Sequence, residues 1–581
     1  MGARDTSGVS RVMDRRHFLR HLAAATGTGA ALALLAACGS TPDAPANTPA
    51  GAATGAGAAP TPALAPTGGG TAPPPAPGSG GTLTWGQWDK TDSIDPAAPT
   101  GSAALDVLTN VLDSLVMIDA DEKVLPALAE KWSVEDSGKT YTFTLRDGVK
   151  FHDGTLLEAV AVKRTFERIL DPATKAAGVV SLLGPIDRIT APDARTVTLA
   201  YKSPYPSLFL QLWRPYFGIL SPRYLDTLKP GDPVAAPVGT GPFRFVGRTA
   251  DGVIALEANK DYAWGAETLT NRNAPYLSGI KFRAIPEGAT RVATLESGEN
   301  LLIDEIPEVD YGRLKGDTRF RFIETPVRAH ALGFMLNVQL APTNDRAVRE
   351  AINWAVDRQT IVQKLFFGVD HVSVGPLAEG VFARLADLEK MYLYDPKKAG
   401  QLLDDAGWKP GSDGIRAKGD AKLSLVLATF RDPWTAIAEA VQGQLRAVGI
   451  DLQVQKMERG AYLDFVRAYK HHLCATSSTS IDPDGILGLN YDSMNLKRTN
   501  FSNLNDPQLD TLLRAAAAKE IGSADRRKGY EDAQRRIMEL VPFVGVMTQV
   551  RVEAMAAKVG GFRLGPDGST ALPLADTQLG R

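Results

Sequence analysis

The chain has 581 residues, of which 44 % are hydrophobic, so it can fill a sizeable core and is too long for one ordinary domain. Its 64 Lys and Arg residues nearly balance its 66 Asp and Glu residues, which gives no electrostatic indication of a nucleic-acid partner. The two cysteines, Cys38 and Cys474, are too few for the disulfide framework of a small secreted scaffold.

The N-terminus has the features of an export signal. Arg15 and Arg16 precede an uncharged apolar stretch at 22–37, which is too short to span a hydrocarbon core of about 30 Å as a mature helix. The arginine pair, with Asp14 before it and Phe-Leu after it, resembles a twin-arginine (Tat) signal. The sequence Leu-Ala-Ala-Cys-Gly around Cys38 resembles a lipobox, in which cleavage leaves a lipidated Cys38 as the new N-terminus. A chance cysteine behind an ordinary secretion signal is the alternative.

Residues 38–80 are predicted to form a disordered tether behind the signal peptide at 1–37. From Ser40 onward this segment is almost wholly Ala, Pro, Gly, Thr and Ser, so it cannot bury enough apolar surface to offset the entropy of ordering. A flexible chain of this length spans about 35 Å on average. We expect the tether to hold a folded body away from a lipid anchor, which needs several acyl chains for stable attachment.

Regular periodicity begins near Gly81. Residues 82–88 read as a strand and 103–115 as a helix. Within 141–145, large apolar residues alternate with polar ones, which is the pattern of a half-buried strand. The apolar residues that next recur at steps of three and four, and predict one buried helix face, are Leu156, Val160, Val162, Phe166, Ile169 and Leu170.

The second half of the chain continues with alternating helices and strands. A helix is predicted over 345–358, continuing through Leu365, and Asp345 lies where a short acceptor side chain can cap free amides. The further expected elements are strands at 195–199, 243–246, 254–258 and 423–427, helices at 437–448 and within 506–541, and returning strands within 541–562.

Two motifs in the first half carry a family resemblance. Residues 127–132 (Ala-Leu-Ala-Glu-Lys-Trp) and 140–154 (Thr-Tyr-Thr-Phe-Thr-Leu-Arg-Asp-Gly-Val-Lys-Phe-His-Asp-Gly) closely resemble the signature of extracellular solute-binding protein family 5. That family comprises the oligopeptide-, dipeptide- and nickel-binding subunits of ABC importers. Further blocks, such as 237–245 and 345–358, are similar to the family as well, and the resemblance runs from about 81 to 570.

The resemblance implies the fold class. We expect an α/β protein with a two-lobed periplasmic-binding-protein-like type II fold, a hinge between the lobes, and mixed sheets flanked by helices. The first lobe would comprise 81–330, completed by 541–581, and the second lobe would comprise 331–540. Two chain crossings, near 322–334 and near Val541, would form the hinge.

The resemblance also implies a function without catalysis. The protein would capture a small polar solute, a peptide or another solute such as a sugar, and deliver it to the transmembrane subunits of an ABC permease. It would be a monomer outside the cytoplasm, either lipid-anchored to the outer face of the cytoplasmic membrane through Cys38 or periplasmic. The alternative is a solute-sensing binding protein that signals to a membrane receptor without import.

No motif indicates an enzyme, a cofactor or a metal. The chain has neither a Gly-x-Ser-x-Gly elbow nor a His-Glu-x-x-His sequence. His471 and His472 lie close to Cys474 without metal-ligand spacing, so we predict solvated histidines beside a buried cysteine. Asp482 and Asp484 flank a proline, an arrangement typical of a turn start rather than of a catalytic carboxylate pair.

Capture of a solute needs a concave surface with aromatic walls and a few polar anchors. Three stretches near inferred strand ends can supply them, at 87–89, 430–434 and 477–484; in peptide-binding relatives the second carries an aromatic residue and an Arg that face the ligand. For any single aromatic residue, packing in the core is an open alternative. The candidate ligand-binding residues are Gln87, Trp88, Trp213, Tyr216, Phe430, Arg431, Trp434, Ser478, Thr479 and Asp482.

One position departs from the peptide binders. They carry an Asp about three residues before Asp-Pro, which pairs with the α-ammonium group of the ligand; aligned on Asp482, that place holds Thr479. A hydroxyl has no charge to offset a desolvated ammonium group, so we hypothesise that dipeptides with a free N-terminus are not the best ligands. The hydroxyl-rich loop suits a neutral polar solute such as a sugar, or an anion near Arg431, and both alternatives stay open.

Overall fold

The computed structural model describes residues 76–98, 101–119, 121–476 and 478–580. They fall within one compact unit of the chain, residues 71–581. The predicted signal peptide, Cys38 and the tether up to residue 75 lie outside the described residues. Within these described ranges, every helix is too short or too polar to cross a membrane.

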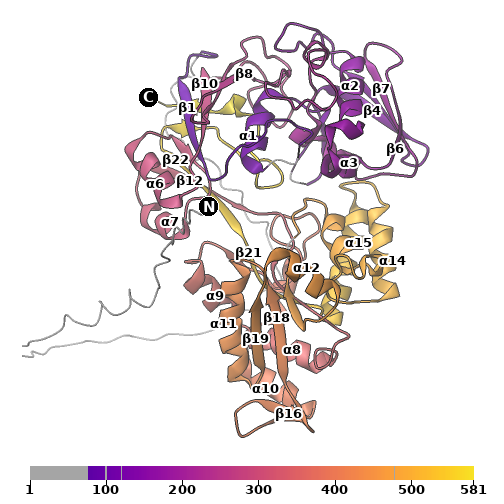
Figure 1. Ribbon diagram of the computed structural model, residues 1–581, viewed down its shortest axis with the longest axis vertical. Helices are drawn as coiled ribbons and strands as arrows, with labels where there is room; N and C mark the ends of the chain where they lie inside the picture. The colour runs from indigo at the N-terminus through magenta and orange to yellow at the C-terminus, as the bar shows by residue number, and fades with distance from the viewer. Residues whose placement is uncertain (1–75, 99–100, 120, 477, 581) are drawn as a thin grey trace, which may run out of the picture. The chain divides into compact units, whose positions relative to one another are not determined.

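The first large sheet joins early and late parts of the chain (Figure 1). β1 lies parallel to β10 and β11, whereas β22 runs antiparallel to β11 and β12. Trp85 on β1 packs against Phe282 and Phe562 with ring centroids 5.4 Å apart in both pairs, in the core on one face of the sheet. A second buried cluster, with Ile303 and Ala554, covers the other face. The strand order is β12 (Phe320–Pro326), β22 (Val550–Ala556), β11 (Leu302–Ile303), β1 (Thr82–Gln87), β10 (Gly279–Ala284), β9 (Ile254–Ala258) and β8 (Phe243–Arg248).

A second sheet contains the alternating strand that the sequence predicts. Its order is β4 (Ala129–Glu135), β5 (Thr140–Leu145), β7 (Thr196–Tyr201) and β6 (Ile186–Thr190). In β5 the side chains of Tyr141, Phe143 and Leu145 are buried, as their alternation with polar residues predicts. We call the part of the chain built on this sheet and the seven-stranded sheet the first lobe.

Helix α2 (Ala159–Leu170) covers the core of this sheet, and its predicted apolar face is only partly right. Val162, Phe166 and Ile169 are buried. Leu156 and Val160, which were predicted on the same face, are 55 % and 43 % exposed. Leu156 precedes the helix, and Val160 lies two residues before Val162 and therefore on a different side of the turn.

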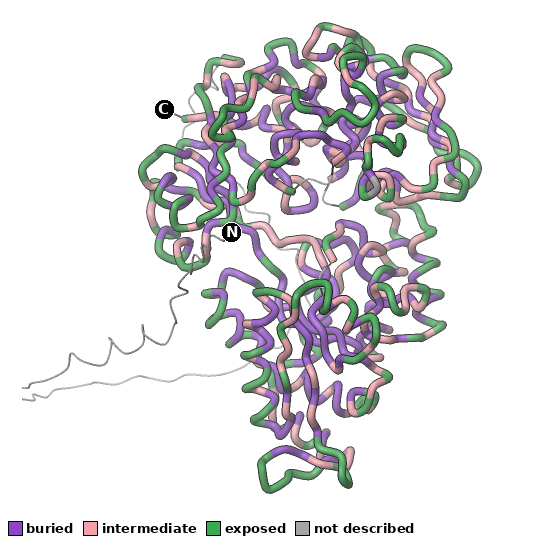
Figure 2. The backbone as a smooth tube through the Cα atoms, viewed as in Figure 1, coloured by how far each residue is buried: buried purple, intermediate pink, exposed green. Residues whose placement is uncertain are grey.

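The third large sheet is the centre of the second lobe. Its four central strands are buried along most of their length, whereas its two edge strands are partly exposed (Figure 2). Helices α8 (Arg346–Ala355), α9 (Arg358–Leu365), α10 (Pro396–Asp405) and α11 (Trp434–Ala447) lie around the sheet (Figure 1). The strand order is β14 (His371–Val372), β21 (Phe543–Thr548), β13 (Leu332–Leu336), β20 (Leu473–Ala475), β18 (Ser424–Thr429) and β19 (Asp451–Lys456).

The predicted helix over 345–365 is two helices. The Asp345 side chain accepts a hydrogen bond from the Ala347 amide at 3.0 Å, which confirms the predicted cap. α8 then ends because Val356 is extended, and Asp357 caps α9 by accepting from the Thr360 amide at 3.0 Å.

The remaining helices and strands complete the two lobes. Helix α1 ends at Val111, earlier than the predicted Leu115, because Leu112 is already extended. The other helices are α1 (Ser102–Val111), α3 (Ala177–Leu183), α4 (Leu208–Leu212), α5 (Pro222–Leu225), α6 (Gly288–Ser297), α7 (Glu308–Leu314), α12 (Arg459–Arg467), α13 (Leu487–Tyr491), α14 (Pro507–Ala517) and α15 (Ala524–Leu540). The short strands are β2 (Val116–Ile118), β3 (Val124–Pro126), β15 (Lys409–Pro410), β16 (Arg416–Lys418), β17 (Ala421–Lys422), β23 (Val559–Gly560) and β24 (Gln578–Leu579).

Two segments connect the first and second lobes. The first lies between β12, which ends at Pro326, and β13, and the second is Gln549 between β21 and β22. The two segments are held together, because the Val327 amide donates a hydrogen bond to the Gln549 carbonyl at 2.8 Å. β21 still pairs within the six-stranded sheet, so the second crossing occurs at Gln549 and not near Val541.

Candidate functional site

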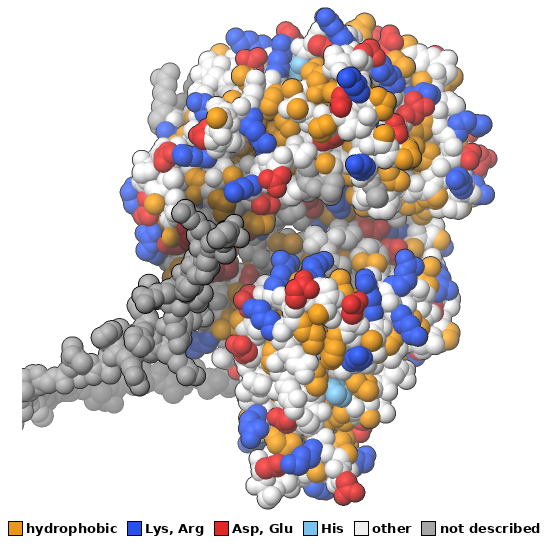
Figure 3. Space-filling view, viewed as in Figure 1, with side chains coloured by type: hydrophobic (Ala, Val, Ile, Leu, Met, Phe, Trp, Pro, Cys, Tyr) orange, Lys and Arg blue, Asp and Glu red, His pale blue; other side chains and the backbone are white. Residues whose placement is uncertain are grey.

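Three neighbouring strands of the second lobe end at the same edge of their sheet. β18 pairs in parallel with β19 on one side and with β20 on the other. The segments that follow their carboxyl ends, at 430–434, 457–460 and 476–482, therefore begin side by side. In open α/β sheets this edge is the usual place of ligand binding. Lys and Arg side chains gather here, over the region where Figure 1 labels α12 (Figure 3).

An aromatic stack lies at this edge. The Phe430 ring is 5.4 Å from the Trp434 ring in a stacked arrangement and 4.9 Å from the Tyr462 ring. Trp434 Nε1 donates to the Thr476 carbonyl at 3.0 Å, and the Tyr462 hydroxyl donates to the Ala475 carbonyl. Trp434 and Tyr462 are each 3 % exposed and belong to the core, so the half-buried Phe430 ring is the member of the stack that can face a solute. Because both outer rings are fixed to the end of β20, the Phe430 ring is held in place before any ligand arrives.

Arg431 lies over this stack and is exposed. Its guanidinium carbon is 5.0 Å from the Trp434 ring centroid and 5.6 Å from that of Phe430. Among the described residues Arg431 makes no ion pair, whereas the neighbouring Asp432 carboxylate is 3.6 Å from Lys456 Nζ. The structure thus brings the predicted residues Phe430, Arg431 and Trp434 together.

The loop after β20 joins the edge to the crossing between the lobes. The His330 amide donates to the Ser478 carbonyl at 2.8 Å, and Thr479 forms a β-bridge with Ala329. The Ser478 hydroxyl accepts from Asn490 Nδ2 at 2.8 Å, whereas the Thr479 side chain is exposed. Thr479 is therefore available to a solute, and Ser478 is engaged in holding the loop.

Asp482, the last candidate in this loop, is used inside the protein. It is 4 % exposed, and its Oδ1 accepts a hydrogen bond from Arg526 Nη2 at 2.6 Å. Its Oδ2 accepts from the Ser207 hydroxyl at 3.4 Å. A buried carboxylate that accepts from the buried Arg526 and from Ser207 positions the loop rather than a solute.

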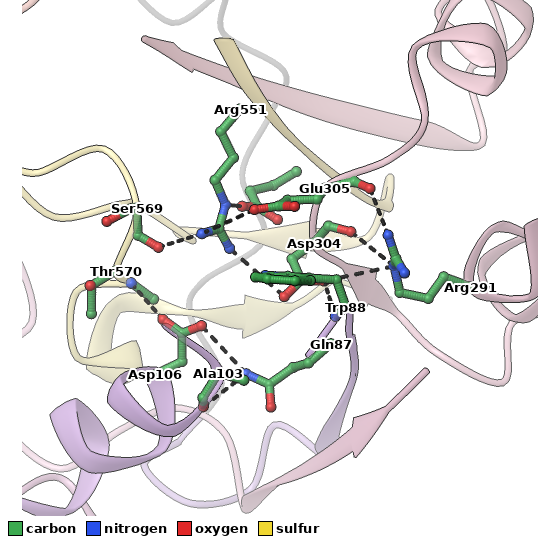
Figure 4. Close-up of polar contacts among 12 residues, drawn as sticks. Gln87, Trp88, Ala103, Asp106, Arg291, Asp304, Glu305, Arg551, Ser569 and Thr570 are labelled. Atoms are coloured by element: carbon green, nitrogen blue, oxygen red, sulfur yellow. Dashed lines mark hydrogen bonds and ion pairs between the residues drawn. The ribbon is translucent and has the colours of Figure 1, made fainter. Parts of the chain in front are cut away.

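On the first lobe, the two residues that end β1 differ in their surroundings. Trp88 is 37 % exposed, and its amide donates to Asp304 Oδ1 at 2.7 Å. Gln87 is buried, and its Nε2 donates to the Ala103 carbonyl at 3.1 Å and to Asp106 Oδ2 at 3.4 Å (Figure 4). Trp88 can present its ring to a solute, whereas the Gln87 amide is satisfied within the lobe.

A buried ionic cluster lies beside these two residues (Figure 4). Arg551 on β22 donates through Nε to the Glu553 carboxylate and through Nη1 to the Ser569 carbonyl at 2.6 Å. Its Nη2 is 3.8 Å from Asp304 Oδ2. Burial raises the pKa of Asp106 to about 7 and also raises the pKa values of the Asp304 and Glu553 carboxyls.

The two weaker candidates are packing residues in this conformation. Trp213 is 5 % exposed, and its Nε1 donates to the Leu210 carbonyl at 3.0 Å. Tyr216 is half-buried and packs against the core of the four-stranded sheet. For both residues the structure shows the packing alternative that the sequence leaves open.

The histidines near Cys474 are not solvated as predicted. His471 is fully buried, its Nε2 lies 2.9 Å from the Phe501 carbonyl oxygen, and burial lowers its pKa to about 4. His472 Nδ1 accepts a hydrogen bond from the Val426 amide at 3.0 Å. Cys474 is buried as predicted. Across the described ranges, no group of three His, Cys, Asp or Glu residues is arranged to hold a metal ion.

Two residues of the site were missed by the sequence analysis, Tyr462 and Arg459. Both lie on α12, which follows β19, and the Arg459 guanidinium carbon is 5.5 Å from the Phe430 ring centroid. The signal that could have found them is the position of their helix directly after a strand parallel to β18. That signal requires the strand order, which the local sequence does not contain.

Comparisons with known proteins identify the family. The model of bacterial extracellular solute-binding proteins, family 5 middle, matches residues 123–496. The glutathione-binding protein GsiB of Pectobacterium atrosepticum is 28 % identical over 490 residues, which cover 82 % of this chain and 90 % of that protein.

Solved structures agree with this result. NikA from Brucella suis in complex with Fe(III)-EDTA has a TM-score of 0.73 at 25 % identity, covering 86 % of this chain and 99 % of that one. DppA from Helicobacter pylori in complex with the peptide STSA has a TM-score of 0.65 at 26 % identity, covering 86 % and 98 %. The predicted two-lobed α/β fold is confirmed. The chain belongs to family 5 of the bacterial extracellular solute-binding proteins, the non-enzymatic substrate-binding subunits of ABC importers.

Proposed function

We propose that this protein binds a small polar solute at the edge formed by the ends of β18, β19 and β20. The observation that carries the proposal is the arrangement at this edge, where a fixed aromatic stack, the exposed Arg431 and the exposed Thr479 follow neighbouring parallel strands. Arg431 has no ion-pair partner among the described residues. Aromatic faces and a few polar groups of this kind orient small ligands.

Movement of the lobes would complete the site. We assign 81–330 with the C-terminal return to the first lobe and 331–540 to the second, with β21 extending the second lobe up to Gln549. Only the two crossing segments, at 327–331 and at Gln549, would have to change their backbone angles for the lobes to close around a solute. Closure would expel water and thereby strengthen each polar contact.

We further assign the protein to the outside of the cytoplasmic membrane as a lipid-anchored monomer. Support comes from the sequence, namely the twin arginines, the apolar stretch at 22–37 and the lipobox-like sequence at Cys38. The tether at 38–80 would give the binding domain a reach of about 35 Å toward the permease.

The ligand class is not fixed by the relatives, because these bind chemically different compounds, namely glutathione, Fe(III)-EDTA and a peptide. Thr479 offers a hydroxyl where a carboxylate would be needed to pair with the ammonium group of a dipeptide. The described residues on either side in the loop, Ser478 and Ser480, carry no charge either. We therefore assign a solute whose recognition does not depend on a free α-ammonium group.

Thr479→Asp is expected to raise the affinity for the dipeptide Ala-Ala at least tenfold, because a charge-assisted hydrogen bond to the ammonium group is gained. The affinity for N-acetyl-Ala-Ala is expected to stay the same or fall. Isothermal titration calorimetry of both variants and both peptides measures the effect, and Thr479→Asn is the uncharged control. Equal affinities of the Asp and Asn variants for Ala-Ala would place the ammonium subsite elsewhere.

A further inference from the structure

Arg431 and Arg459 occupy equivalent positions after two neighbouring parallel strands. Arg431 follows β18, and Arg459 follows β19. Arg459 is the first residue of α12, and Arg431 lies just before α11. Their guanidinium carbons are 5.5 Å and 5.6 Å from the centroid of the same Phe430 ring. Two cationic groups from separate segments therefore converge on one aromatic ring.

The carboxylates near these two arginines are already engaged. The Asp432 carboxylate is 3.6 Å from Lys456 Nζ, and Glu458 Oε2 accepts from the Gly460 amide at 2.7 Å, where it caps α12. Among the described residues neither Arg431 nor Arg459 makes an ion pair, and both side chains are exposed. Two positive charges thus lie at the site without a negative partner in the part of the chain that the structure describes.

Stacking on an aromatic ring prepares an arginine to bind an anion. The ring contacts the face of the planar guanidinium group and leaves the N–H donors at its edge free for a carboxylate, which it can bind in a bidentate manner. The stack itself does not move easily, since Trp434 and Tyr462 are bonded to the Thr476 and Ala475 carbonyls. Little side-chain entropy is then lost when the anion binds.

We propose that Arg431 and Arg459 together select a solute that carries two carboxylate groups. This inference rests on the proposed function and narrows its ligand class from polar solutes to dianionic ones. A sugar without an acid group would leave both guanidinium groups unpaired after lobe closure. A dianion would neutralise both charges, and Thr479, in the loop that follows the neighbouring strand β20, would donate its hydroxyl to an oxygen of the solute.

The test uses three compounds of one shape and decreasing charge: N-acetyl-glutamate, N-acetyl-glutamine and N-acetyl-glutamine amide. The full-length protein is titrated with each by calorimetry. We expect the dianion to bind at least tenfold more tightly than the monoanion and at least a hundredfold more tightly than the neutral amide. Neutral and dianionic compounds of equal affinity, or no binding of the dianion, would overturn the inference. Neither result would contradict the proposed function. That function is tested separately, by the titration of the Thr479 variants and by the identification of a co-purified solute.

Variants locate the effect. Arg459→Gln is expected to weaken the affinity for the dianion at least tenfold and the affinity for the neutral amide less than twofold. The same changes are expected for Arg431→Gln. Lys456→Gln removes one positive charge from the same edge and is the matched control, with an expected change below threefold; it is made and compared in an Asp432→Asn parent, so that no carboxylate is released beside Arg431. All three side chains are exposed, so the unfolding temperatures should agree. An effect of Lys456→Gln as large as that of Arg459→Gln would show general attraction of anions and overturn the role of the arginine pair.

Discussion

Arg551→Met is expected to lower the free energy of unfolding by about 3–5 kcal/mol at pH 8, because it removes the buried cation that pairs with Glu553 and leaves Arg291, 3.8 Å from Asp304, as the remaining buried cation of the cluster. The Arg551 side chain is 4 % exposed, and the carboxylates of Glu553 and Asp304 that face it are fully buried. Asp106 lies in the same cluster, and its interaction with Arg551 counteracts part of the effect of burial on its pKa. Removing one arginine therefore leaves three buried acidic groups close together.

The loss of unfolding free energy in Arg551→Met should become smaller as pH falls. The pKa of Asp106 is raised from 3.8 to about 7 by burial, so the folded protein binds a proton more tightly than the unfolded chain does. The stability from this group is fully present below about pH 4 and is lost as pH rises through 7. In the Met variant the same carboxyl groups hold protons still more tightly, so the deficit should shrink as pH falls from 8 to 5.

Urea unfolding at pH 8 and pH 5 measures both effects. Arg319→Met is the matched control, since Arg319 pairs with Asp317 at the surface and its side chain is 63 % exposed. We expect this control to leave the urea midpoint unchanged at either pH, because solvent screens an exposed ion pair. A loss below about 1 kcal/mol for Arg551→Met at pH 8 would contradict the role given to the cluster.

Arg526→Met is also expected to lower the free energy of unfolding by about 3–5 kcal/mol, because it too removes a buried cation from its carboxylate partners. The Arg526 side chain on α15 is 1 % exposed and donates to Asp482 at 2.6 Å; its Nε is 3.9 Å from Glu122 Oε2. Glu122 belongs to the turn between β2 and β3 of the first lobe, whereas Asp482 and Arg526 belong to the second. The substitution thus removes a buried cation that is shared by both lobes.

Burial, followed by the charge of Asp482, raises the pKa of Glu122 to about 8. At pH 7 this group is therefore largely protonated in the folded protein, and Asp482 is the carboxylate that most needs the arginine. Adding Asp482→Asn to Arg526→Met should recover at least about 1 kcal/mol in urea unfolding at pH 7, because the unpaired charge is gone. Arg535→Met is the control, because Arg535 lies on the same helix and its ion pair with Asp387 is exposed. A double variant no more stable than Arg526→Met alone would argue against a charge effect.

Local patterns in the sequence predicted local elements well. The alternation in β5 and the Asp345 cap of α8 depend only on neighbours in the chain, and both are confirmed. Errors arose where a boundary decides the outcome. Val160 was placed on the buried face of α2 because it lies four residues after Leu156. Leu156 precedes the first residue of the helix, so this spacing does not define a helix face.

The ionic clusters could not be predicted, because their members come together only in the folded chain. Asp106, Asp304 and Arg551 lie on three elements whose proximity follows from the order of strands β1, β11 and β22. The local sequence around each of these residues does not distinguish it from a charged residue at the surface. The same holds for Glu122 and Arg526, which are distant in the chain and meet between the lobes.

The candidate site was predicted in part. The family resemblance pointed to Phe430, Arg431 and Trp434, and the structure brings them together. The same reasoning could not tell an exposed side chain from one bonded inside the protein, as Gln87 shows. Arg459 was missed because its place beside Arg431 follows from the parallel pairing of β18 with β19.

The most direct test of the whole account is native mass spectrometry of the full-length protein, purified from the producing cell without dialysis. We expect one small-molecule adduct per chain, released on denaturation, whose fragmentation shows two carboxylate groups. The presence of one such solute would support both reversible capture and the arginine pair as its determinant. A protein without any adduct, or one that carries a dipeptide with a free N-terminus, would contradict the account.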